Sequence, residues 1–505
     1  MAEEAKAAGE PQPRTTEGEV SPVDKLYQLI DVAAPKGAAN FDTIVEGTAG
    51  TSDMISVALQ VFLGQVKQSG TVEKVDKVLV DKNIADIDRL LSLQLDEIVH
   101  HQDFQKLESS WRGLRFLVDR TDFRKNIKLE LLQVSKDELL QDFEDSPETV
   151  QSGLYKHIYV QEYDQAGGEP IGAVIGNYHF GRSPQDIALL QNIAKVSAAC
   201  HAPFLSSVDA AFFGLDDTRK LQHKPDKKAI FESVEYIKWN SFRKTEDARY
   251  LGLTFPQFLT RLPYGPETTP VKAFNYVEDV KGTDHHKYVW GNSAFALATN
   301  LTRSFAQNGW CVQIRGPESG GTVENLPIHL FDAGGNKEAK VPSEFYIPDT
   351  DELAYAELGL IPLVSYKNRD YAVFFSAQSV QEPQKYNTAE ATANSRISAR
   401  LPYIFLVSRL AHYLKVIQRE NIGSTKDRSV LEDELNTWIK KYVTEMKKPT
   451  PDVIAKHPLR AAQVTVQDIA ENPGFFRVQL TVMPHFQIEG MDIGISLVGQ
   501  MPKAK

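Results

Sequence analysis

The apolar positions predict helices at the start of the chain. Residues 21–34 show the i, i+3, i+4, i+7 spacing of one helical face, at Val23, Leu26, Tyr27 and Ile30. Ser21 and Pro22 suit the start of this helix, because Ser accepts bonds from first-turn amides and Pro needs no amide partner there. Since an isolated helix this short is marginal in water, it is a candidate binding motif, with packing on its own domain as the alternative.

Two further helical regions follow. Residues 52–68 keep Ile55, Leu59, Phe62 and Val66 in phase. Residues 84–119 predict one or two longer helices with two apolar faces. One face holds Ile84, Ile87, Leu91, Leu95 and Ile98, and the other holds Phe104, Leu107, Trp111, Leu114 and Val118.

From about residue 126 the pattern changes to mixed helix and strand. The predicted strands are 127–131, 171–175, 311–314 and a hairpin of 361–366 with 371–376. The predicted helices are 183–199, opened by Ser183-Pro184, and 292–308, ended by Gly309. This part therefore favours a mixed α/β fold.

The last hundred residues predict helices followed by an antiparallel meander. Residues 394–445 are mostly helical, interrupted at Pro402 and Gly423. Between 462 and 498 apolar and polar residues alternate in three runs. The apolar members are Val464 and Val466, then Phe476, Val478, Leu480 and Val482, then Ile493, Ile495 and Leu497. A small sheet at a chain end has free edges, which must be protected or are meant to be paired.

These patterns divide the chain into five predicted parts. They are an acidic, disordered tail over 1–20, a short helix with its linker over 21–51, a helical region over 52–125, a mixed α/β domain over 126–390 and a C-terminal domain over 391–505. The predicted fold class is thus α+β or mixed α/β, with several domains.

Composition and charge exclude several classes of protein. The 505 residues are 42% hydrophobic and 24% charged, as in an ordinary soluble globular protein. A net charge of −11 argues against a non-specific nucleic-acid binder. The exception is residues 394–448, where eleven Lys and Arg stand against six Asp and Glu, giving +5.

Neither a signal peptide nor a membrane span is expected. The N-terminus has no apolar core of a signal peptide, and no apolar run approaches the ~18 residues that a membrane helix needs. The cysteines, Cys200 and Cys311, are spaced too far apart for a redox or zinc motif and predict a reducing, cytoplasmic compartment.

The search for chemistry gives one weak candidate. Residues 316–321 have the GxxxxG spacing of a phosphate loop, but the phosphate-binding Lys is missing and Pro317 removes a backbone donor. The pair His285-His286 lies in a polar stretch that predicts a solvated loop, and Cys200-His201 reads as structural because adjacent side chains seldom face each other. We predict no catalytic, cofactor-binding or metal site, and no cofactor.

Long ordered motifs resemble a known family, the large subunit of the type VI secretion contractile sheath, called TssC or VipB. The motifs are Trp111-Arg112-Gly113-Leu114, Ala248-Arg249-Tyr250, Arg261-Leu262-Pro263-Tyr264-Gly265, Trp290-Gly291-Asn292, Gly309-Trp310-Cys311, Ile314-Arg315-Gly316, Gly320-Gly321, Asp370-Tyr371-Ala372, Ala399-Arg400-Leu401-Pro402-Tyr403, Arg409-Leu410-Ala411-His412-Tyr413 and Pro484-His485-Phe486. The resemblance runs from about residue 50 to the C-terminus.

The resemblance implies a structural, non-enzymatic role in the bacterial cytoplasm. A protein of this family pairs with a small sheath subunit, polymerises with copies of itself into a helical cylinder around an inner tube of hexamers, and contracts to propel the tube. The baseplate and a hexameric AAA+ disassembly ATPase are further implied partners, whereas nucleic acid and membrane insertion are not. The inner domain is expected to be similar to phage tail sheaths.

Three groups of residues then become candidates for contacts. The ATPase-gripped helix carries Val23, Leu26, Tyr27, Leu29 and Ile30. The inter-subunit sheet carries Val464, Val466, Phe476, Val478, Leu480, Ile493 and Ile495. The candidate tube-facing cations are Arg400, Arg409, Lys415 and Arg419, with a solvated basic face as the alternative.

Two rival functions stay open on the sequence. One is an α/β nucleotide-binding enzyme that uses the 316–321 glycine loop. The other is an adaptor that binds one partner in discrete complexes and never polymerises.

Overall fold

The computed structural model describes residues 77–485, except residues 225, 447 and 470–475. The tail 1–20, the predicted helices in 21–34 and 52–68, and the predicted strand with Ile493 and Ile495 lie outside the described residues. The chain forms two compact units. One comprises residues up to Val99 together with Tyr264–Glu278, and the other comprises His100–Pro263 and the residues from Asp279 onward.

The smaller unit is built around helix α4 (Lys77–Val99). The buried Tyr276 donates its hydroxyl hydrogen bond to Asp96 Oδ1 at 2.6 Å. The predicted apolar face is present, but four of its members are 40–55% exposed, namely Ile84, Ile87, Leu91 and Ile98. The predicted apolar face of this helix is therefore present and largely exposed in the described residues.

The larger unit contains a six-stranded sheet in the order β1-β2-β3-β9-β10-β6. Its strands are β1 (Val174–Phe180), β2 (Phe204–Val208), β3 (Leu251–Phe255), β6 (Thr322–Val323), β9 (Ile361–Ser365) and β10 (Ala372–Phe374). The first four strands in the sheet order run parallel, while β10 and β6 are antiparallel to their neighbours. Every residue of β2, β3 and β9 is buried, as expected for a sheet covered on both faces.

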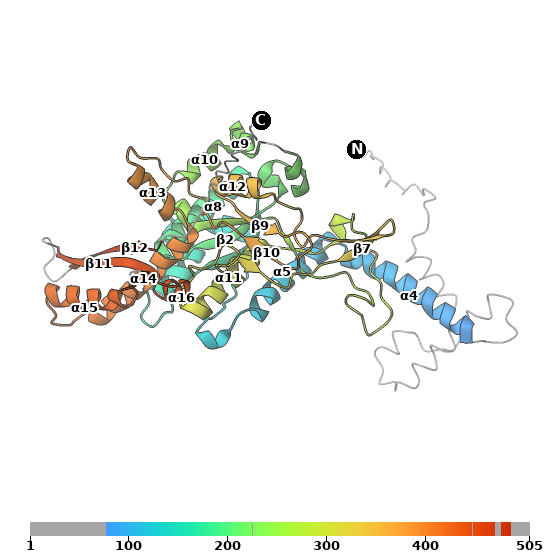
Figure 1. Ribbon diagram of the computed structural model, residues 1–505, viewed down its shortest axis with the longest axis horizontal. Coiled ribbons are helices and arrows are strands. Elements are labelled where there is room, and N and C mark those ends of the chain that lie inside the picture. Colours follow the sequence, from blue (N-terminus) through green and yellow to red (C-terminus); the bar gives the residue numbers. More distant parts are fainter. Residues whose placement is uncertain (1–76, 225, 447, 470–475, 486–505) are drawn as a thin grey trace, which may run out of the picture. The chain divides into compact units, whose positions relative to one another are not determined.

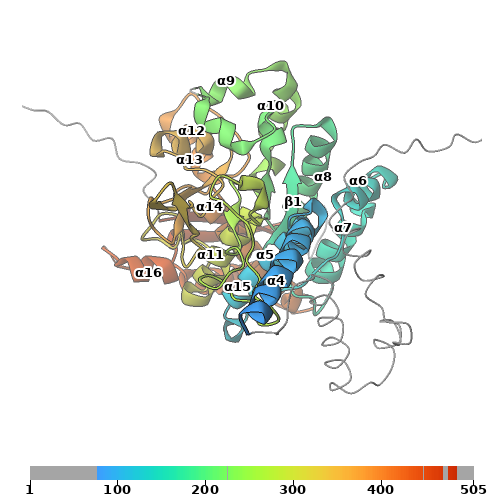
Figure 2. The same ribbon diagram turned by 90° about the vertical axis from the view of Figure 1, so that its right-hand side faces the viewer.

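Helices cover the two faces of this sheet. Alternate strand residues point to opposite sides, so Phe204 joins the core under α8 (Pro184–Cys200), and Leu205 joins the core under α11 (Ser293–Asn308). Figure 1 shows α8 above the strands and α11 below them, and Figure 2 shows α6 and α7 beside α8. The mixed α/β fold that the sequence predicts is confirmed.

Further elements of the larger unit surround these layers. The helices are α5 (Gln102–Asp119), α6 (Lys136–Asp145), α7 (Gly153–Tyr155), a π-helix (Lys156–Asp164), α9 (Lys227–Phe231), α10 (Ile237–Arg243), α12 (Asp349–Glu357), α13 (Ala389–Ser398), α14 (Leu401–Asn421), α15 (Arg428–Lys440) and α16 (Pro451–Lys456). The strand pairs are β4 (Phe258–Leu259) with β5 (Trp290–Gly291), β7 (Leu330–Ala333) with β8 (Asn336–Ala339), and β11 (Leu459–Asp468) with β12 (Phe476–Pro484).

Local signals placed several elements correctly. Helix α8 has Ser183 as its N-cap and Pro184 in its first turn, and α11 ends at Gly309, whose φ of 78° suits glycine. The predicted hairpin around 367–370 is the antiparallel pair β9–β10.

Three predicted strands need correction. Residues 127–131 form no strand, and Leu131 is 72% exposed, because alternation alone supplies no neighbouring strand to bond with. Residues 311–314 form none either, since the amide of Gln313 donates to the Ser304 hydroxyl instead of to a strand. The run at 171–175 contributes only its end to β1, which continues to Phe180.

A buried histidine fixes α14 against α8. His412 is 2% exposed, and its Nε2 donates to the carbonyl oxygen of Cys200 at 2.9 Å. The rings of Tyr163 and His201 lie beside it. Burial lowers the pKa of His412 to about 4, and the nearby positive charge of Arg409 acts in the same direction. The imidazole is therefore neutral in the folded chain near pH 7.

The low pKa of His412 predicts a loss of stability in acid. The unfolded chain, with a histidine pKa near 6.5, binds the proton first, so the free energy of unfolding falls between about pH 6.5 and 4. The full effect is about 3 kcal/mol. We expect His412→Gln, which keeps a donor for Cys200, to lose less stability than the wild type between pH 7.5 and 4.5, measured by urea denaturation. The exposed His157→Gln is the matched control, and identical pH dependence in His412→Gln and wild type contradicts the prediction.

Candidate assembly site at the C-terminal hairpin

The hairpin β11–β12, which packs beside helix α15, is the part of the larger unit where backbone N–H and C=O groups most clearly lack hydrogen bonds. The two strands pair antiparallel, with Val464 opposite Leu480 and Val466 opposite Val478. Figure 1 shows this hairpin and α15 side by side at one end of the larger unit. The strands form a two-stranded sheet in the described residues, so each strand has an outer edge.

One face of the hairpin is apolar and packs on helices. Val464 and Val466 are fully buried, together with Leu435 and Ile439 of α15. Phe476, Val478, Leu480 and Val482 pack against the same cluster and are half-buried. The predicted alternation between an apolar and a polar face is confirmed for these two strands.

The outer edge of β11 is bonded to side chains of α15. Asn436 accepts from the Val464 amide at 3.0 Å and donates to the Val464 carbonyl at 2.8 Å. Glu432 accepts from the Val466 amide at 3.0 Å, and Arg428 donates to the Val466 carbonyl at 3.5 Å. At the start of the strand, Leu459 bonds to the backbone of 442–444. These α15 residues were not predicted from the sequence, where their signal is polar residues at i, i+4 and i+8.

The outer edge of β12 differs. Because the N–H and C=O groups of Val464 and Val466 point away from β12, those of the opposite residues, Leu480 and Val478, point away from β11. Within the described part of the chain, no group is bonded to them. This edge is thus available to a further strand.

The four candidate tube-facing cations have partners within the chain. Lys415 Nζ lies 2.9 Å from Asp164 Oδ1, and Arg419 donates to the carbonyls of Gln165 and Tyr163. The guanidinium of Arg409 lies 4.8 Å from the centre of the Tyr413 ring.

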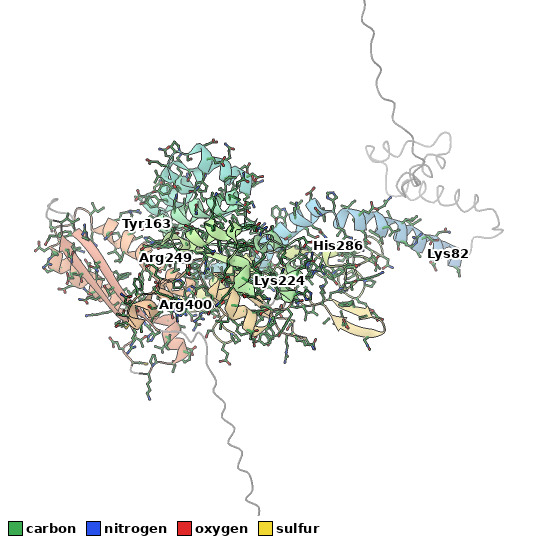
Figure 3. All side chains as sticks on the ribbon, turned by 90° about the horizontal axis from the view of Figure 1, so that it is seen from above. Lys82, Tyr163, Lys224, Arg249, His286 and Arg400 are labelled. Carbon is green, nitrogen blue, oxygen red and sulfur yellow. The ribbon has the colours of Figure 1, made fainter. Side chains whose placement is uncertain are left out.

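The fourth cation, Arg400, precedes α14 as its N-cap residue. Figure 3 labels Arg400 and Tyr163, both on the part of the larger unit that adjoins the hairpin. The tube-facing role of the four cations stays a prediction.

Helix α5 carries a second exposed apolar surface. Phe104, Leu107 and Trp111 share one face and are 40%, 57% and 62% exposed. The opposite side of the helix packs inward, with Phe116 and Leu117 buried and Ser109 Oγ donating to the Trp290 carbonyl. The sequence predicted this apolar stripe, and these three members of it are exposed in the structure.

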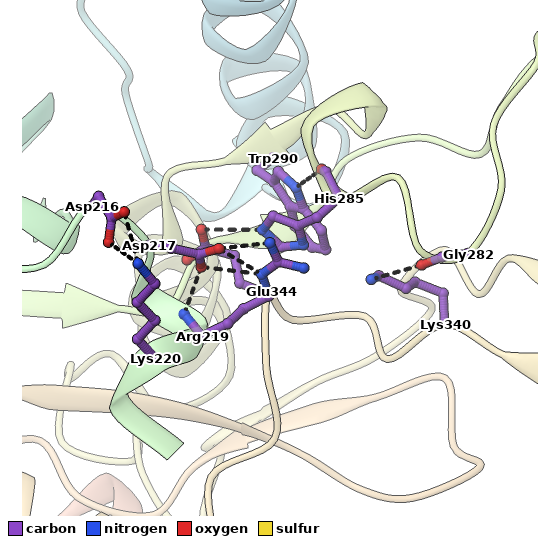
Figure 4. A network of polar contacts seen from close by, with 9 residues as sticks. All are labelled: Asp216, Asp217, Arg219, Lys220, Gly282, His285, Trp290, Lys340 and Glu344. Carbon is purple, nitrogen blue, oxygen red and sulfur yellow. Dashed lines mark hydrogen bonds and ion pairs between the residues drawn. The ribbon is translucent and has the colours of Figure 1, made fainter. Parts of the chain in front are cut away.

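A polar network joins three loops beside β5 (Figure 4). Glu344 Oε2 accepts from the Gln257 amide at 2.9 Å, and its Oε1 lies 3.8 Å from His285 Nε2. His285 stacks on Trp290 with ring centres 4.7 Å apart and is only 13% exposed. The expectation of a solvated loop is therefore wrong for His285. Because Glu344 is hydrogen-bonded and His285 is stacked on another ring, the network holds these loops together.

Backbone amides of the glycine loop at 316–321 donate hydrogen bonds within the fold. The Gly316 amide donates to the Phe374 carbonyl and the Gly321 amide to the Gly316 carbonyl. Arg303 donates to the carbonyls of Gly320 and Thr322, which holds the loop from outside. The loop is therefore a tight structural connection.

The two cysteines show no activation. Burial raises the pKa of both thiols to about 12, which leaves very little thiolate near pH 7. In the residues that the structure describes, no three His, Cys, Asp or Glu side chains gather as a metal site would require. No helix in the same residues is both long and apolar enough to span a bilayer.

An open strand edge and an exposed apolar helix face define a protein that associates with other chains. Comparison with known proteins agrees. Residues 81–381 match the model of VipB, the EvpB/VC_A0108 tail sheath N-terminal domain. Residues 390–501 match VipB_2, the EvpB/VC_A0108 tail sheath gpW/gp25-like domain. The chain belongs to the VipB, or TssC, family of tail sheath proteins.

Similar individual proteins bear related names. The type VI secretion system sheath protein TssC1 of Pseudomonas aeruginosa is 44% identical over 430 residues, which are 84% of this chain and 86% of that protein. Among solved structures, the anti-feeding prophage baseplate is 8% identical, with a TM-score of 0.36 over 74% of this chain and 83% of that chain. The contracted helical sheath of the same prophage is 10% identical, with a TM-score of 0.30 over 62% and 68%. The resemblance inferred from the sequence motifs is confirmed by the family matches.

The packing of the glycine loop predicts the result of one substitution. A Cβ on Gly321 would lie 2.4 Å from the Gly316 nitrogen and 2.5 Å from the Phe374 carbonyl oxygen, so the backbone must shift. We expect Gly321→Ala to destabilise the fold by about 2 kcal/mol or more and to lower the thermal midpoint.

The matched control is Gly172→Ala, because no atom lies within 4 Å of a Cβ placed there. Nucleotide binding, measured by fluorescence titration, is expected to be absent from the wild type. A wild type that binds nucleotide, together with a Gly321→Ala chain that folds normally but does not bind, would favour the enzyme hypothesis.

Proposed function

We propose that this chain is the large subunit of a bacterial type VI secretion contractile sheath. In this role it pairs with a small sheath subunit, polymerises into a helical cylinder around an inner tube of hexamers, and contracts to drive the tube outward. The observation that carries the proposal is the open outer edge of β12. Membership of the tail sheath family and 44% identity to a type VI sheath protein support it.

Strand addition at the hairpin is the proposed link between subunits. A strand donated by another chain bonds to the outer N–H and C=O groups of β12, and its apolar side chains extend the face of Val478 and Leu480. Ile493 and Ile495 have the alternation that such a strand needs. Each backbone hydrogen bond adds only about 0.5–1.5 kcal/mol, but several along one strand act together.

The exposed face of α5 is the proposed contact with the small sheath subunit. Phe104, Leu107 and Trp111 follow the i, i+3, i+7 spacing by which helices pack in grooves or against other helices. Trp111 is 62% exposed, and a large aromatic side chain of this kind often dominates the energy of an interface.

The other proposed contacts follow from the assembly. Arg400, Arg409, Lys415 and Arg419 lie in the basic C-terminal segment and face carboxylates of the tube, while the end of the cylinder meets the baseplate. The chain works in the cytoplasm as a structural protein, without cofactor, nucleic acid or membrane insertion.

Co-expression with the small sheath subunit tests the proposal. We expect negative-stain electron microscopy to show hollow, striated rods. Trp111→Asp is expected to abolish co-purification of the two subunits and therefore the rods, because a carboxylate replaces the centre of the apolar face. Lys106→Asp, at another exposed position of α5, is the matched control and keeps the rods.

Two outcomes would contradict the proposal. Discrete particles from two folded wild-type chains favour the one-to-one adaptor. If Trp111→Asp instead lowers the thermal midpoint of this chain alone, the α5 face packs on its own chain and the proposed small-subunit contact is wrong.

The helix predicted in residues 21–34 is the proposed handle for a hexameric AAA+ disassembly ATPase. Its apolar residues, Val23, Leu26, Tyr27, Leu29 and Ile30, are those we expect to be gripped.

Leu26→Asp should leave rod formation intact and slow ATP-dependent disassembly of contracted rods at least tenfold, followed by light scattering. Gln28→Asp, on the polar side of the predicted helix, is the control, and normal disassembly of Leu26→Asp rods would refute the assignment.

A further inference from the structure

The two halves of helix α14 are attached to the larger unit in different ways. The first half is held by apolar packing, since Leu401, Ile404 and Phe405 belong to the core on one face of the sheet. From His412 onward, polar side chains on one face of the helix make the contacts with α8 and with the π-helix. The attachment of the second half to these two elements is therefore sensitive to charge.

The ring of His412 has no place for a second proton. Its Nε2 donates to the Cys200 carbonyl at 2.9 Å, so this nitrogen carries the proton of the neutral ring. Its Nδ1 is buried, and no described residue is hydrogen-bonded to it. A proton added to Nδ1 creates a buried N–H without an acceptor and a buried charge without a counter-ion. Both are costly in free energy.

The charged groups around His412 do not compensate a positive ring. Burial is the main cause of the low pKa of His412, and the charges of Arg409, on its own helix, and His201, at the end of α8, lower this pKa further. The carboxylate of Asp164, on the π-helix, lies 2.9 Å from Lys415 Nζ and is therefore already paired. A protonated His412 thus meets like charges and a carboxylate that is bonded elsewhere.

The rings beside His412 are also uncharged near pH 7. The centres of the Tyr163 and His201 rings lie 5.6 Å and 6.4 Å from its own. The hydroxyl of Tyr250, from the turn before β3, is 3.1 Å from His201 Nδ1. Burial raises the pKa of Tyr163, of Tyr250 and of the Cys200 thiol, so none of them supplies a negative charge.

We propose that His412 is an acid-sensitive contact that, when protonated, releases the second half of α14 from α8 and the π-helix. Release brings water to Nδ1, which removes both costs. It also separates Lys415 from Asp164. Arg419 loses the carbonyl of Tyr163 in the same movement. Acid thereby frees two of the candidate tube-facing cations for another partner. That link to the tube rests on the proposed function, whereas the release itself concerns this chain alone.

The release is expected between about pH 6.5 and 4. The ring of His412 binds a proton with a pKa of about 4 in the closed form and near 6.5 once it is in water. Because the released form binds the proton first, its population rises as the pH falls through this range. From pH 7.5 to pH 5 the ratio of released to closed chain rises roughly twenty-five-fold.

The two native cysteines report this movement in the full-length chain. Cys200 ends α8, and its carbonyl accepts the bond from His412, whereas Cys311 packs against the core that contains Ile404 and Phe405. Both thiols are treated with a dipyridyl disulfide, which reacts with thiols in mild acid, and the two labelled peptides are measured separately by mass spectrometry. Each labelling rate is divided by the rate of the same cysteine in urea at the same pH.

Between pH 7.5 and pH 5 we expect the relative labelling rate of Cys200 to rise at least tenfold and that of Cys311 to rise less than twofold. His412→Gln keeps a donor for the Cys200 carbonyl but binds no proton, so the rise at Cys200 should fall below threefold. The exposed His157→Gln is the matched control and keeps the wild-type profile.

Three results overturn the proposal. The first is an unchanged labelling rate of Cys200 in the wild type, and the second is an equal rise in the wild type and His412→Gln. The third is a parallel rise at Cys200 and Cys311 with loss of helical circular dichroism, which indicates that the whole chain unfolds. If His412→Gln does not fold, His412→Asn replaces it, and the comparison of the two thiols in the wild type still decides. None of these results depends on rods, so a failure of the proposed sheath function is detected separately in the co-expression test.

Discussion

The hydrogen-bonding demand of the C-terminal hairpin is the constraint on which the proposed assembly depends. Each strand of a two-stranded sheet has an outer row of N–H and C=O groups that must bond to something. In this chain Asn436 and Glu432 bond to the outer groups of Val464 and Val466 in β11, whereas the outer groups of Val478 and Leu480 have no bond within the described residues. The difference leaves β12 with the more open edge of the two strands.

Helix α5 likewise carries a surface that is not covered by the described residues. On α5 one side is fixed to the larger unit by Ser109, Phe116 and Leu117, and the other leaves Trp111 largely exposed. An apolar stripe of this size on a water-facing helix is best explained by a partner. A subunit that needs neighbours at both a strand edge and a helix face is suited to a polymer, where each contact is repeated along the assembly.

The interior of the larger unit, by contrast, is well covered. The sheet is covered on both faces, and the buried His412 is hydrogen-bonded through its Nε2. The 316–321 loop is held by hydrogen bonds of its own amides and by Arg303. Groups that resemble a catalytic constellation in the sequence, such as Cys200-His201 and His285-His286, serve packing or loop contacts.

Short-range rules determined much of the fold. The caps Ser183 and Gly309, the hairpin at 367–370 and the alternation at Val464 and Val466 depend on neighbours along the chain, so periodicity and turn chemistry were sufficient. The ordered motifs also identified the family, which the comparisons confirmed.

Long-range contacts decided the rest. Alternation at 127–131 predicted a strand, but a strand forms only where another lies beside it, and none does. The apolar faces of α4 and α5 were clear, yet whether they meet a core or solvent depends on packing across the chain. The bonds from Asn436 to Val464, 28 residues away, lay beyond any local pattern. The sequence by itself determined which faces are apolar and which strands alternate, and tertiary structure decided which of those surfaces are left for a partner, because only packing fixes which backbone and apolar groups are already satisfied.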